Sequence, residues 1–278
     1  MPEPHCRDFD KIKSDCEALE RAYPEFKSNI FQVVAPGKTL RSFSKTFRDY
    51  IEYCPPHKLT QTKGSTWAYQ GLDDLVSVVS SHTIGGRWWL TEHYERWKAG
   101  VMEKTCHPVF SVVSGPGTGK SRMLDEAPTI LSRSLERKLA AGNDVSALTA
   151  RIASALLFSI TFENGTPIDD SARSADVQIG ARMIKQMIPE MSMRQIFDTM
   201  PWSPVDVIAK LAESIGIPVN DLSVILCVDS IQHFAPERQK DVVACLAGLA
   251  NAGPAFVIPF CCSFGGLKLR QFFETGSY

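Results

Sequence analysis

The residues with the clearest chemistry lie at positions 111–122, between an apolar run and a helix-forming segment. Their sequence is Ser-Val-Val-Ser-Gly-Pro-Gly-Thr-Gly-Lys-Ser-Arg. Glycines let a backbone wrap closely around a ligand, so that successive N–H groups point at phosphate oxygens. Lys120 would bring a positive charge to the β- and γ-phosphates, and the Ser121 hydroxyl would contact Mg²⁺. We therefore expect a phosphate-binding loop formed by Ser114, Gly115, Pro116, Gly117, Thr118, Gly119, Lys120, Ser121 and Arg122.

This loop departs from the P-loop consensus at one position. Counting back from Gly119 places Ser114 where the first glycine belongs, and serine tolerates a positive φ less well than glycine. We expect Gly115 to absorb part of that turn. An ordinary Gly/Pro turn is the alternative, although three glycines alternating into Lys-Ser after an apolar strand disfavour it. A dinucleotide-binding loop is also disfavoured, because Lys120 stands where its third glycine would be.

A P-loop needs a carboxylate at the tip of a neighbouring strand to hold Mg²⁺. Asp229 directly follows the apolar run Val224–Val228 and is the candidate for this magnesium-site carboxylate. The alternative is an aspartate that merely ends a buried strand at a turn. Lys120, Asp229 and Gln232 are the residues expected to take part in catalysis.

The residue after Asp229 raises a question about turnover. Many P-loop ATPases place a glutamate there to polarise the attacking water, whereas this chain has Ser230, which is a weak base. A glutamate at position 230 would then be expected to speed hydrolysis. Gln232 is the first candidate for orienting water, and His233 is more simply explained as a helix-start residue.

Polar residues also follow the other apolar runs, where the carboxyl edge of a parallel sheet would lie. These residues are Glu163 and Asn164 after one run and Ser263 after another. Arg122 and Arg182 are expected to be surface or ion-pair residues rather than arginine fingers. No Asn-Lys-x-Asp guanine signature occurs, so we expect a purine nucleotide, with ATP the first candidate, together with Mg²⁺.

Composition and charge narrow the class of protein. The 278 residues are 44% hydrophobic and carry a net charge of −1, which suits a globular protein and does not support a nucleic-acid partner. The eight cysteines show no zinc spacing, and Cys227, Cys261 and Cys262 lie in apolar runs, as expected for buried, reduced thiols. The start of the chain shows no signal peptide and no stretch could cross a membrane, so an intracellular location is expected.

Strand and helix patterns alternate from about residue 106. Strands are expected near 108–113, 155–162, 222–228 and 255–262. Helices are expected at 176–188 and 236–249. Two more are expected to begin at residue 119, with a break at Pro128, and at Pro204, with Ser203 as N-cap. Apolar strands in such alternation predict an α/β fold, a parallel sheet flanked by helices. We therefore expect a mainly helical N-terminal region, 1–105, and a P-loop NTPase-like domain, 106–278.

The N-terminal region shows two helical patterns. Phe9, Ile12, Cys16 and Leu19 recur at helical spacing in the first. In the second, Leu90, Tyr94 and Trp97 share one face, after Trp88 and Trp89. Packing against the neighbouring domain explains these aromatic side chains better than an aromatic platform that stacks on a base.

Several of these segments together resemble a known family. The chain is similar to the P-loop NTPase region of Crinkler-type effectors, which are related to retrotransposon hot spot proteins, over about residues 105–265. The segments that carry the resemblance are His107–Arg122, Ser159–Gly165, Ile179–Met183, Val228–Gln232 and Phe256–Pro259.

The resemblance implies a role that the residues alone do not. Family members carry the NTPase module behind a translocation header, often with a nuclease-like domain, and act inside host cells, frequently in the nucleus. It implies a protein partner or host target, and Lys120, Ser121 and Asp229 as the nucleotide and magnesium residues. The Leu-Phe-Leu-Ala-Lys-type header motif is not present, and Glu95-x-x-Lys98 alone does not make a nuclease site. About 16 residues follow the fourth expected strand, so we expect a truncated or divergent member.

Two main functions follow from these observations, and a third, a nucleic-acid-stimulated motor or nuclease, is the weakest because of the near-zero net charge and the missing nuclease motif. The first is Mg²⁺-dependent binding of a purine nucleoside triphosphate, with hydrolysis left open by Ser230. The alternative is a non-catalytic effector or scaffold protein built on a degenerate ATPase fold.

Overall fold

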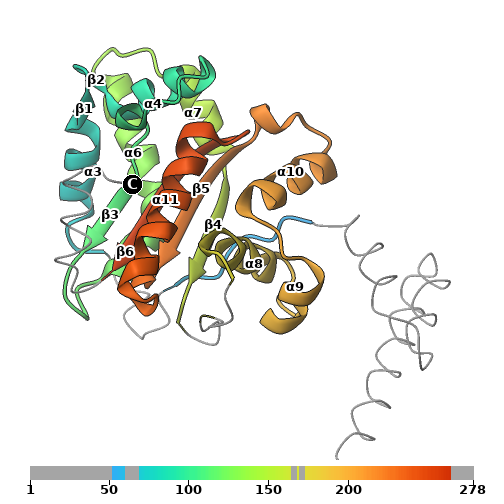
Figure 1. The fold of residues 1–278 in the computed structure, drawn as a ribbon. Coiled ribbons are helices and arrows are strands. Elements are labelled where there is room, and N and C mark those ends of the chain that lie inside the picture. Colours follow the sequence, from blue (N-terminus) through green and yellow to red (C-terminus); the bar gives the residue numbers. More distant parts are fainter. Residues whose placement is uncertain (1–51, 60–68, 164–167, 169–172, 264–278) are drawn as a thin grey trace, which may run out of the picture. The chain divides into compact units, whose positions relative to one another are not determined.

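The computed structural model describes residues 52–59, 69–163, 168 and 173–263 (Figure 1). All of them belong to one compact unit, Ile51–Tyr278. The helices are α3 (Leu72–Ser81), α4 (Trp89–Lys98), α5 (Lys120–Asp125), α6 (Ala127–Ala140), α7 (Ser146–Ala153), α8 (Ala175–Met187), α9 (Met193–Thr199), α10 (Pro204–Ile215) and α11 (Pro236–Ala252), with 3₁₀ turns η4 (Lys104–Cys106), η5 (Val219–Asp221) and η6 (Ile231–His233). The strands are β1 (Thr83–Ile84), β2 (Arg87–Trp88), β3 (Phe110–Val113), β4 (Leu156–Thr161), β5 (Ser223–Asp229) and β6 (Phe256–Ser263).

The larger sheet has four parallel strands in the order β3-β6-β5-β4. Every residue of β5 and β6, the two central strands, is buried. Strands buried on both faces read as continuous apolar runs, which is how they were recognisable in the sequence. The predicted α/β class, with a parallel sheet flanked by helices, is confirmed.

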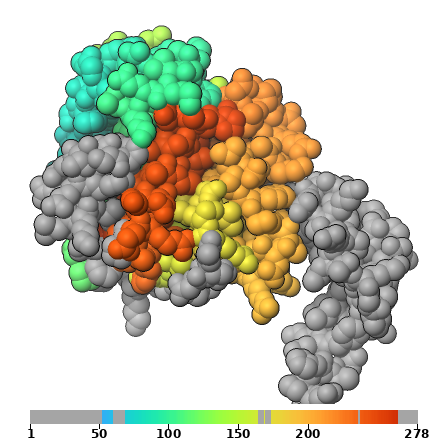
Figure 2. All heavy atoms as spheres, viewed as in Figure 1, coloured from blue at the N-terminus to red at the C-terminus, as the bar shows by residue number. Residues whose placement is uncertain are grey.

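Alternate residues of β5 face two different cores. Val224, Leu226 and Val228 pack with α8, α10 and α11, whereas Ile225 and Cys227 pack with α3, α5 and α6. This alternation is the period of two that a strand imposes on its side chains. In Figure 2, the orange-red residues of α11 lie between the teal and green residues of the 70–106 region and the lighter orange residues of the α8–α10 region.

The predicted helix signals agree with the observed helix ends. Ser203 caps α10 in a capping box, in which its Oγ accepts from Asp206 N at 3.3 Å and Asp206 Oδ2 accepts from Ser203 N at 2.9 Å. The predicted break near Pro128 is confirmed, since α5 ends at Asp125 and α6 begins at Ala127. Helices α3, α7 and α9 were not predicted.

The aromatic residues of α4 pack against the sheet domain. The rings of Tyr94 and Trp97 lie 5.2 and 5.5 Å from the ring of Phe256, and Trp97 Nε1 donates to Gly253 O at 3.1 Å. Trp88 and Trp89 are buried, and both donate to the carbonyl of Val79. These contacts support the packing interpretation of this helix over an aromatic platform.

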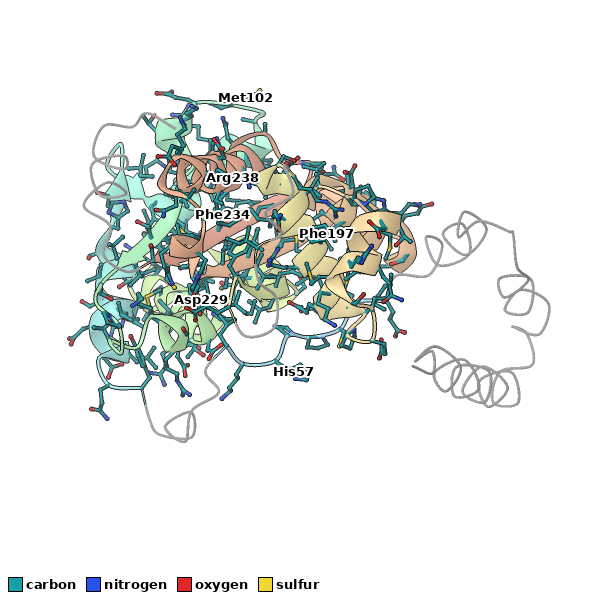
Figure 3. The ribbon with its side chains drawn as sticks, turned by 60° about the horizontal axis from the view of Figure 1, so that its bottom comes forward. His57, Met102, Phe197, Asp229, Phe234 and Arg238 are labelled. Atoms are coloured by element: carbon teal, nitrogen blue, oxygen red, sulfur yellow. The ribbon has the colours of Figure 1, made fainter. Side chains whose placement is uncertain are left out.

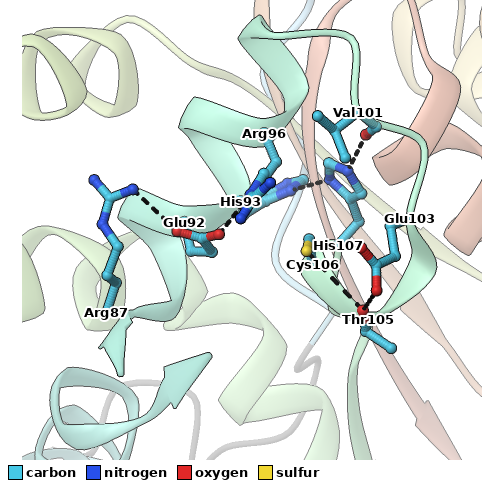
Figure 4. A network of polar contacts seen from close by, with 9 residues as sticks. All are labelled: Arg87, Glu92, His93, Arg96, Val101, Glu103, Thr105, Cys106 and His107. Atoms are coloured by element: carbon cyan, nitrogen blue, oxygen red, sulfur yellow. Dashed lines mark hydrogen bonds and ion pairs between the residues drawn. The ribbon is translucent and has the colours of Figure 1, made fainter. Parts of the chain in front are cut away.

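A buried histidine pair joins α4 to β6 (Figure 4). His93 Nε2 lies 3.0 Å from Val257 O, and His107 Nε2 lies 2.7 Å from Val101 O. The two Nδ1 atoms lie 2.8 Å apart. Burial lowers the pKa of His93 to about 3 and also lowers the pKa of His107.

The described part of the N-terminal region contributes to the same core as the sheet. Val76 and Val79 of α3 and Trp89 and Leu90 of α4 share an apolar cluster with α5 and α6. The boundary at 105/106 stays a prediction, and the helix expected at residues 9–19 lies outside the described residues.

Candidate functional site

The expected phosphate loop connects β3 to α5. Gly117 and Gly119 adopt φ values of 74° and 84°, which only glycine adopts readily, and residues 115–118 are exposed. The two glycines therefore turn the chain at the two places where a side chain would strain it. The loop is therefore tightly turned and open to solvent.

Ser114 does not need the conformation of the glycine it replaces. Its N–H continues the sheet by donating to Ser263 O at 3.3 Å, and among the described non-glycine residues only Ser230 has a positive φ. The expectation that Gly115 absorbs part of the turn is wrong, because its φ is not positive either. Ser114 Oγ lies 2.6 Å from Thr118 Oγ1, which donates to Gly115 O at 2.8 Å, so two hydroxyl groups fasten the loop.

Lys120 folds back over this loop. Its Nζ donates to Gly115 O at 2.6 Å and to Ser114 O at 3.2 Å. The side chain is half-buried, and these two contacts hold its ammonium group against the loop backbone. Pro116 lies between the contacted carbonyl and the first turning glycine, and its side chain is exposed.

Ser121 and Asp229 meet across the sheet, although they are far apart in the sequence. Ser121 Oγ donates to Asp229 Oδ2 at 2.7 Å, which joins the start of α5 to the end of β5 (Asp229 is labelled in Figure 3). The other oxygen, Oδ1, accepts from Cys262 Sγ at 2.6 Å and from Ser230 Oγ at 3.2 Å. Burial, together with the Asp229 carboxylate, raises the pKa of Cys262, so this thiol stays protonated and donates.

Cys262 was predicted to be a buried thiol but not to contact Asp229. The parallel register pairs Val228 with Cys261, which places the next residue of β6 beside the end of β5. That register was not visible in the sequence. The predicted burial of Cys227, Cys261 and Cys262 is confirmed, and all three are free thiols.

Ser230 is held in the left-handed region, with φ 63° and ψ 40°, and is 5% exposed. A glutamate here would bury a second carboxylate against Asp229 and keep a non-glycine residue in an unfavourable conformation. We therefore expect a glutamate at position 230 to lower the stability of the fold, while its effect on hydrolysis stays a prediction. Gln232 follows in η6, and its Oε1 is buried without a hydrogen-bond partner.

Glu163 and His233 form a pair at the same edge of the sheet. Phe162 N donates to Asp229 O at 3.3 Å, so Glu163 comes directly after a residue that touches the Asp229 backbone. Glu163 Oε1 lies 2.6 Å from His233 Nε2, and both side chains reach solvent. The explanation of His233 as a simple helix-start residue misses this contact, which depends on the order of β4 and β5.

The remaining polar candidates lie in different environments. Arg122 forms an ion pair with Glu126 at 2.8 Å, as expected. Arg182 is buried rather than at the surface, lies 4.3 Å above the Phe162 ring and donates to backbone oxygen atoms. Burial lowers the pKa of Arg182 to about 9. Asn164 lies outside the described residues.

The residues present fit a magnesium nucleotide. Ser263 Oγ, at the end of β6 beside Ser114, is buried without a hydrogen-bond partner, as is Gln232 Oε1. Buried polar atoms need partners, and two orphans at the carboxyl edge are consistent with a polar ligand there. Within the described ranges, no cluster of three or more His, Cys, Asp or Glu residues is found. Mg²⁺ bound with a nucleotide needs no such cluster, since water and phosphate supply most of its ligands.

Comparison with known proteins identifies a relative of this chain. The chain is 30% identical over 227 residues to Crinkler effector protein 108 of Phytophthora sojae, an alignment that covers 76% of this chain and 26% of that protein. This match supports a Crinkler-type relationship. The chain spans about a quarter of the length of this relative. No family model matches the chain.

No helix within the described residues has the length and apolar character needed to span a membrane.

Proposed function

We propose that this chain is a P-loop NTPase-like domain that binds a purine nucleoside triphosphate, with ATP the first candidate, together with Mg²⁺. The observation that carries the proposal is the 2.7 Å contact between Ser121 and Asp229, residues that the sequence separates by more than a hundred positions. A hydroxyl from the end of a glycine loop and a strand-end carboxylate are the pair that holds Mg²⁺ in P-loop proteins.

Each residue has a distinct part in this proposal. The turns at Gly117 and Gly119 let the loop backbone approach the phosphates, and Lys120 binds the β- and γ-phosphates in place of the carbonyls of Ser114 and Gly115. Ser121 and Asp229 hold Mg²⁺, which would neutralise phosphate charge when bound. Cys262 and Ser230 keep the Asp229 carboxylate in place by donating to its second oxygen.

Hydrolysis needs a group that orients or activates water, and we assign this part to Glu163. Glu163 directly follows Phe162, whose N–H donates to Asp229 O at 3.3 Å, and Glu163 Oε1 lies 2.6 Å from His233 Nε2. A carboxylate held by histidine can act as a general base, whereas the hydroxyl of Ser230 cannot. Gln232 remains the second candidate for orienting water.

Calorimetric titration of ATP with and without Mg²⁺ tests the proposal. Lys120→Ala should weaken binding about 10- to 150-fold, because hydrogen bonds to charged groups contribute about 1.5–3 kcal/mol. Asp229→Asn should remove the part of the affinity that depends on Mg²⁺ and leave metal-free binding in place. Thermal unfolding should show both variants folded, because the Lys120 side chain is only half-buried at an exposed loop and asparagine keeps the size of the aspartate it replaces.

Lys210→Ala is the matched control, because it removes a lysine from α10, where Lys210 pairs with the exposed Glu213. It should bind ATP as the wild type does. Equal affinity of the wild-type and Lys120→Ala proteins for ATP would refute the proposal.

A second function is favoured by the comparison: an effector or scaffold module that acts by contacting a host protein. Its support is the effector name of the relative and the buried serine at position 230. Phosphate release that is present in the wild type and lost in Lys120→Ala would reject the purely non-catalytic form. Delivery into a host cell and action in its nucleus would fit this second function, as the resemblance to Crinkler-type effectors implies.

A further inference from the structure

A cavity of about 560 Å³ adjoins the phosphate loop on the side of α3 and α6. Its lining includes Tyr69, Gln70, Asp73, Asp74, Arg122 and Glu126. Pockets that take small molecules commonly span about 300–1,000 Å³, so the cavity is large enough for a nucleoside. Tyr69 and Gln70 were expected to belong to a separate N-terminal region, and no sequence pattern connected them with a ligand.

Tyr69 links this cavity to the loop. Its Cε2 atom lies 3.8 Å from the position that a Cβ would occupy on Gly119, the residue before Lys120. The ring is partly buried against the core cluster that contains α5 and α6. Arg122 lines the cavity and directly follows Ser121, so the cavity begins one residue beyond the expected magnesium ligand.

The charge of the lining indicates what the cavity can accept. Three carboxylates, those of Asp73, Asp74 and Glu126, lie in the wall, against the guanidinium groups of Arg122 and Arg133. Arg122 is paired with Glu126 at 2.8 Å and Arg133 with Asp73 at 3.3 Å. A wall with an excess of carboxylates disfavours a second anion and favours groups that donate hydrogen bonds, such as ribose hydroxyls and an exocyclic amine.

We propose that this cavity is the nucleoside subsite, in which the ring of Tyr69 stacks on the purine base and the acidic wall accepts hydrogen bonds from the ribose. The assignment rests on the proposed function, because the subsite continues from the phosphate loop. It makes Tyr69 and Gln70, which lie just before α3, part of the ligand site. It also explains in structural terms why a nucleotide would bind more tightly than a bare phosphate chain.

Titration with two probes, Mg²⁺-ATP and Mg²⁺-tripolyphosphate, separates the nucleoside from the phosphates. Tyr69→Leu keeps an apolar side chain but removes the aromatic face, and it should weaken ATP binding about 5- to 150-fold while leaving tripolyphosphate binding unchanged. Tyr69→Phe is the matched control and should keep the affinity for ATP. Lys120→Ala should weaken both probes.

The outcomes distinguish the two proposals. If the wild type binds neither probe, the proposed function fails and the subsite with it. If the wild type binds both and Tyr69→Leu lowers both alike, or lowers neither, the nucleoside assignment is overturned while the phosphate site stands. Saturation-transfer-difference NMR on the wild type adds a measurement that needs no variant. Strong transfer to the H2 and H8 protons of ATP supports stacking, and transfer confined to the ribose overturns it.

Discussion

The buried histidine pair predicts that the protein loses stability on mild acidification. Carbonyl oxygens only accept hydrogen bonds, so the contacts to Val257 O and Val101 O require both Nε2 atoms to carry a proton. In the neutral pair no proton then remains for the 2.8 Å contact between the Nδ1 atoms. A third proton would fill that contact but would place a positive charge in a fully buried site.

Burial decides this competition, because it lowers the pKa of His93 to about 3 and also lowers that of His107. The unfolded chain takes up protons on histidine near pH 6.5, while the folded pair stays neutral. The unfolded state therefore binds more protons as the pH falls from 6.5 toward 3, and the free energy of unfolding decreases over that range. For His93 alone the loss between pH 7.5 and pH 5.5 is about 1.4 kcal/mol.

Urea unfolding at a series of pH values between 7.5 and 5.5 measures this slope. His93→Gln keeps a side-chain N–H that can reach Val257 O but removes the titrating group, so its slope should be smaller than that of the wild type. His82→Gln, at an exposed position, is the control and should leave the slope unchanged. A free energy of unfolding that stays level or rises as the pH falls would mean that the folded pair holds the third proton, and would refute the reasoning.

Two further predictions concern the carboxyl edge of the sheet. Ser230→Glu should lower the free energy of unfolding by about 2 kcal/mol or more in urea titrations, because it buries a second carboxylate beside Asp229. Ser230→Gly should stay within about 1 kcal/mol of the wild type, because glycine relieves the positive φ. Equal stability of the two variants would contradict the buried position of this residue. Glu163→Gln should slow phosphate release about 10²- to 10⁴-fold and leave the affinity for ATP unchanged. Glu190→Gln, a substitution at an exposed position, is the control and should have no effect. An unchanged rate in Glu163→Gln would mean that Gln232 rather than Glu163 orients the water.

The strands of the larger sheet could be predicted because their burial leaves a direct record in the sequence. β5 and β6 are apolar along their length since both of their faces lie in a core, and Ser203-Pro204 marks the start of α10 through a capping box. The turned loop between β3 and α5 could be predicted because its signal is local: its glycines, lysine and serine lie within ten consecutive residues. Its part in binding phosphate stays a prediction. Asp229 could be predicted for the same reason, as the carboxylate that ends an apolar run.

Contacts between distant elements could not be predicted in this way. The approach of Cys262 to Asp229, of Glu163 to His233 and of Tyr69 to Gly119 depends on strand order and helix packing. Gly180 is a further example, because it lies inside α8 with no turn to explain it. A Cβ there would fall 2.0 Å from Trp202 O, so the helix needs a glycine to pass that backbone.

The two serines that stand in place of consensus residues, Ser114 and Ser230, have different consequences. Ser114 lies on an extension of β3 with a backbone that any residue can adopt, and its hydroxyl helps to fasten the loop through Thr118. Ser230 is buried and keeps a positive φ, so a carboxylate cannot be placed there without loss of stability. The first exchange leaves the proposed binding half of the site intact, and the second removes the usual position of the base. If the domain hydrolyses nucleotide, the base must therefore come from the end of another strand. Our candidate is Glu163, which follows β4 and comes directly after Phe162, the residue whose N–H contacts the Asp229 backbone. Binding and turnover in this chain would then depend on different strands, which is why substitutions at Lys120 and Glu163 should separate them.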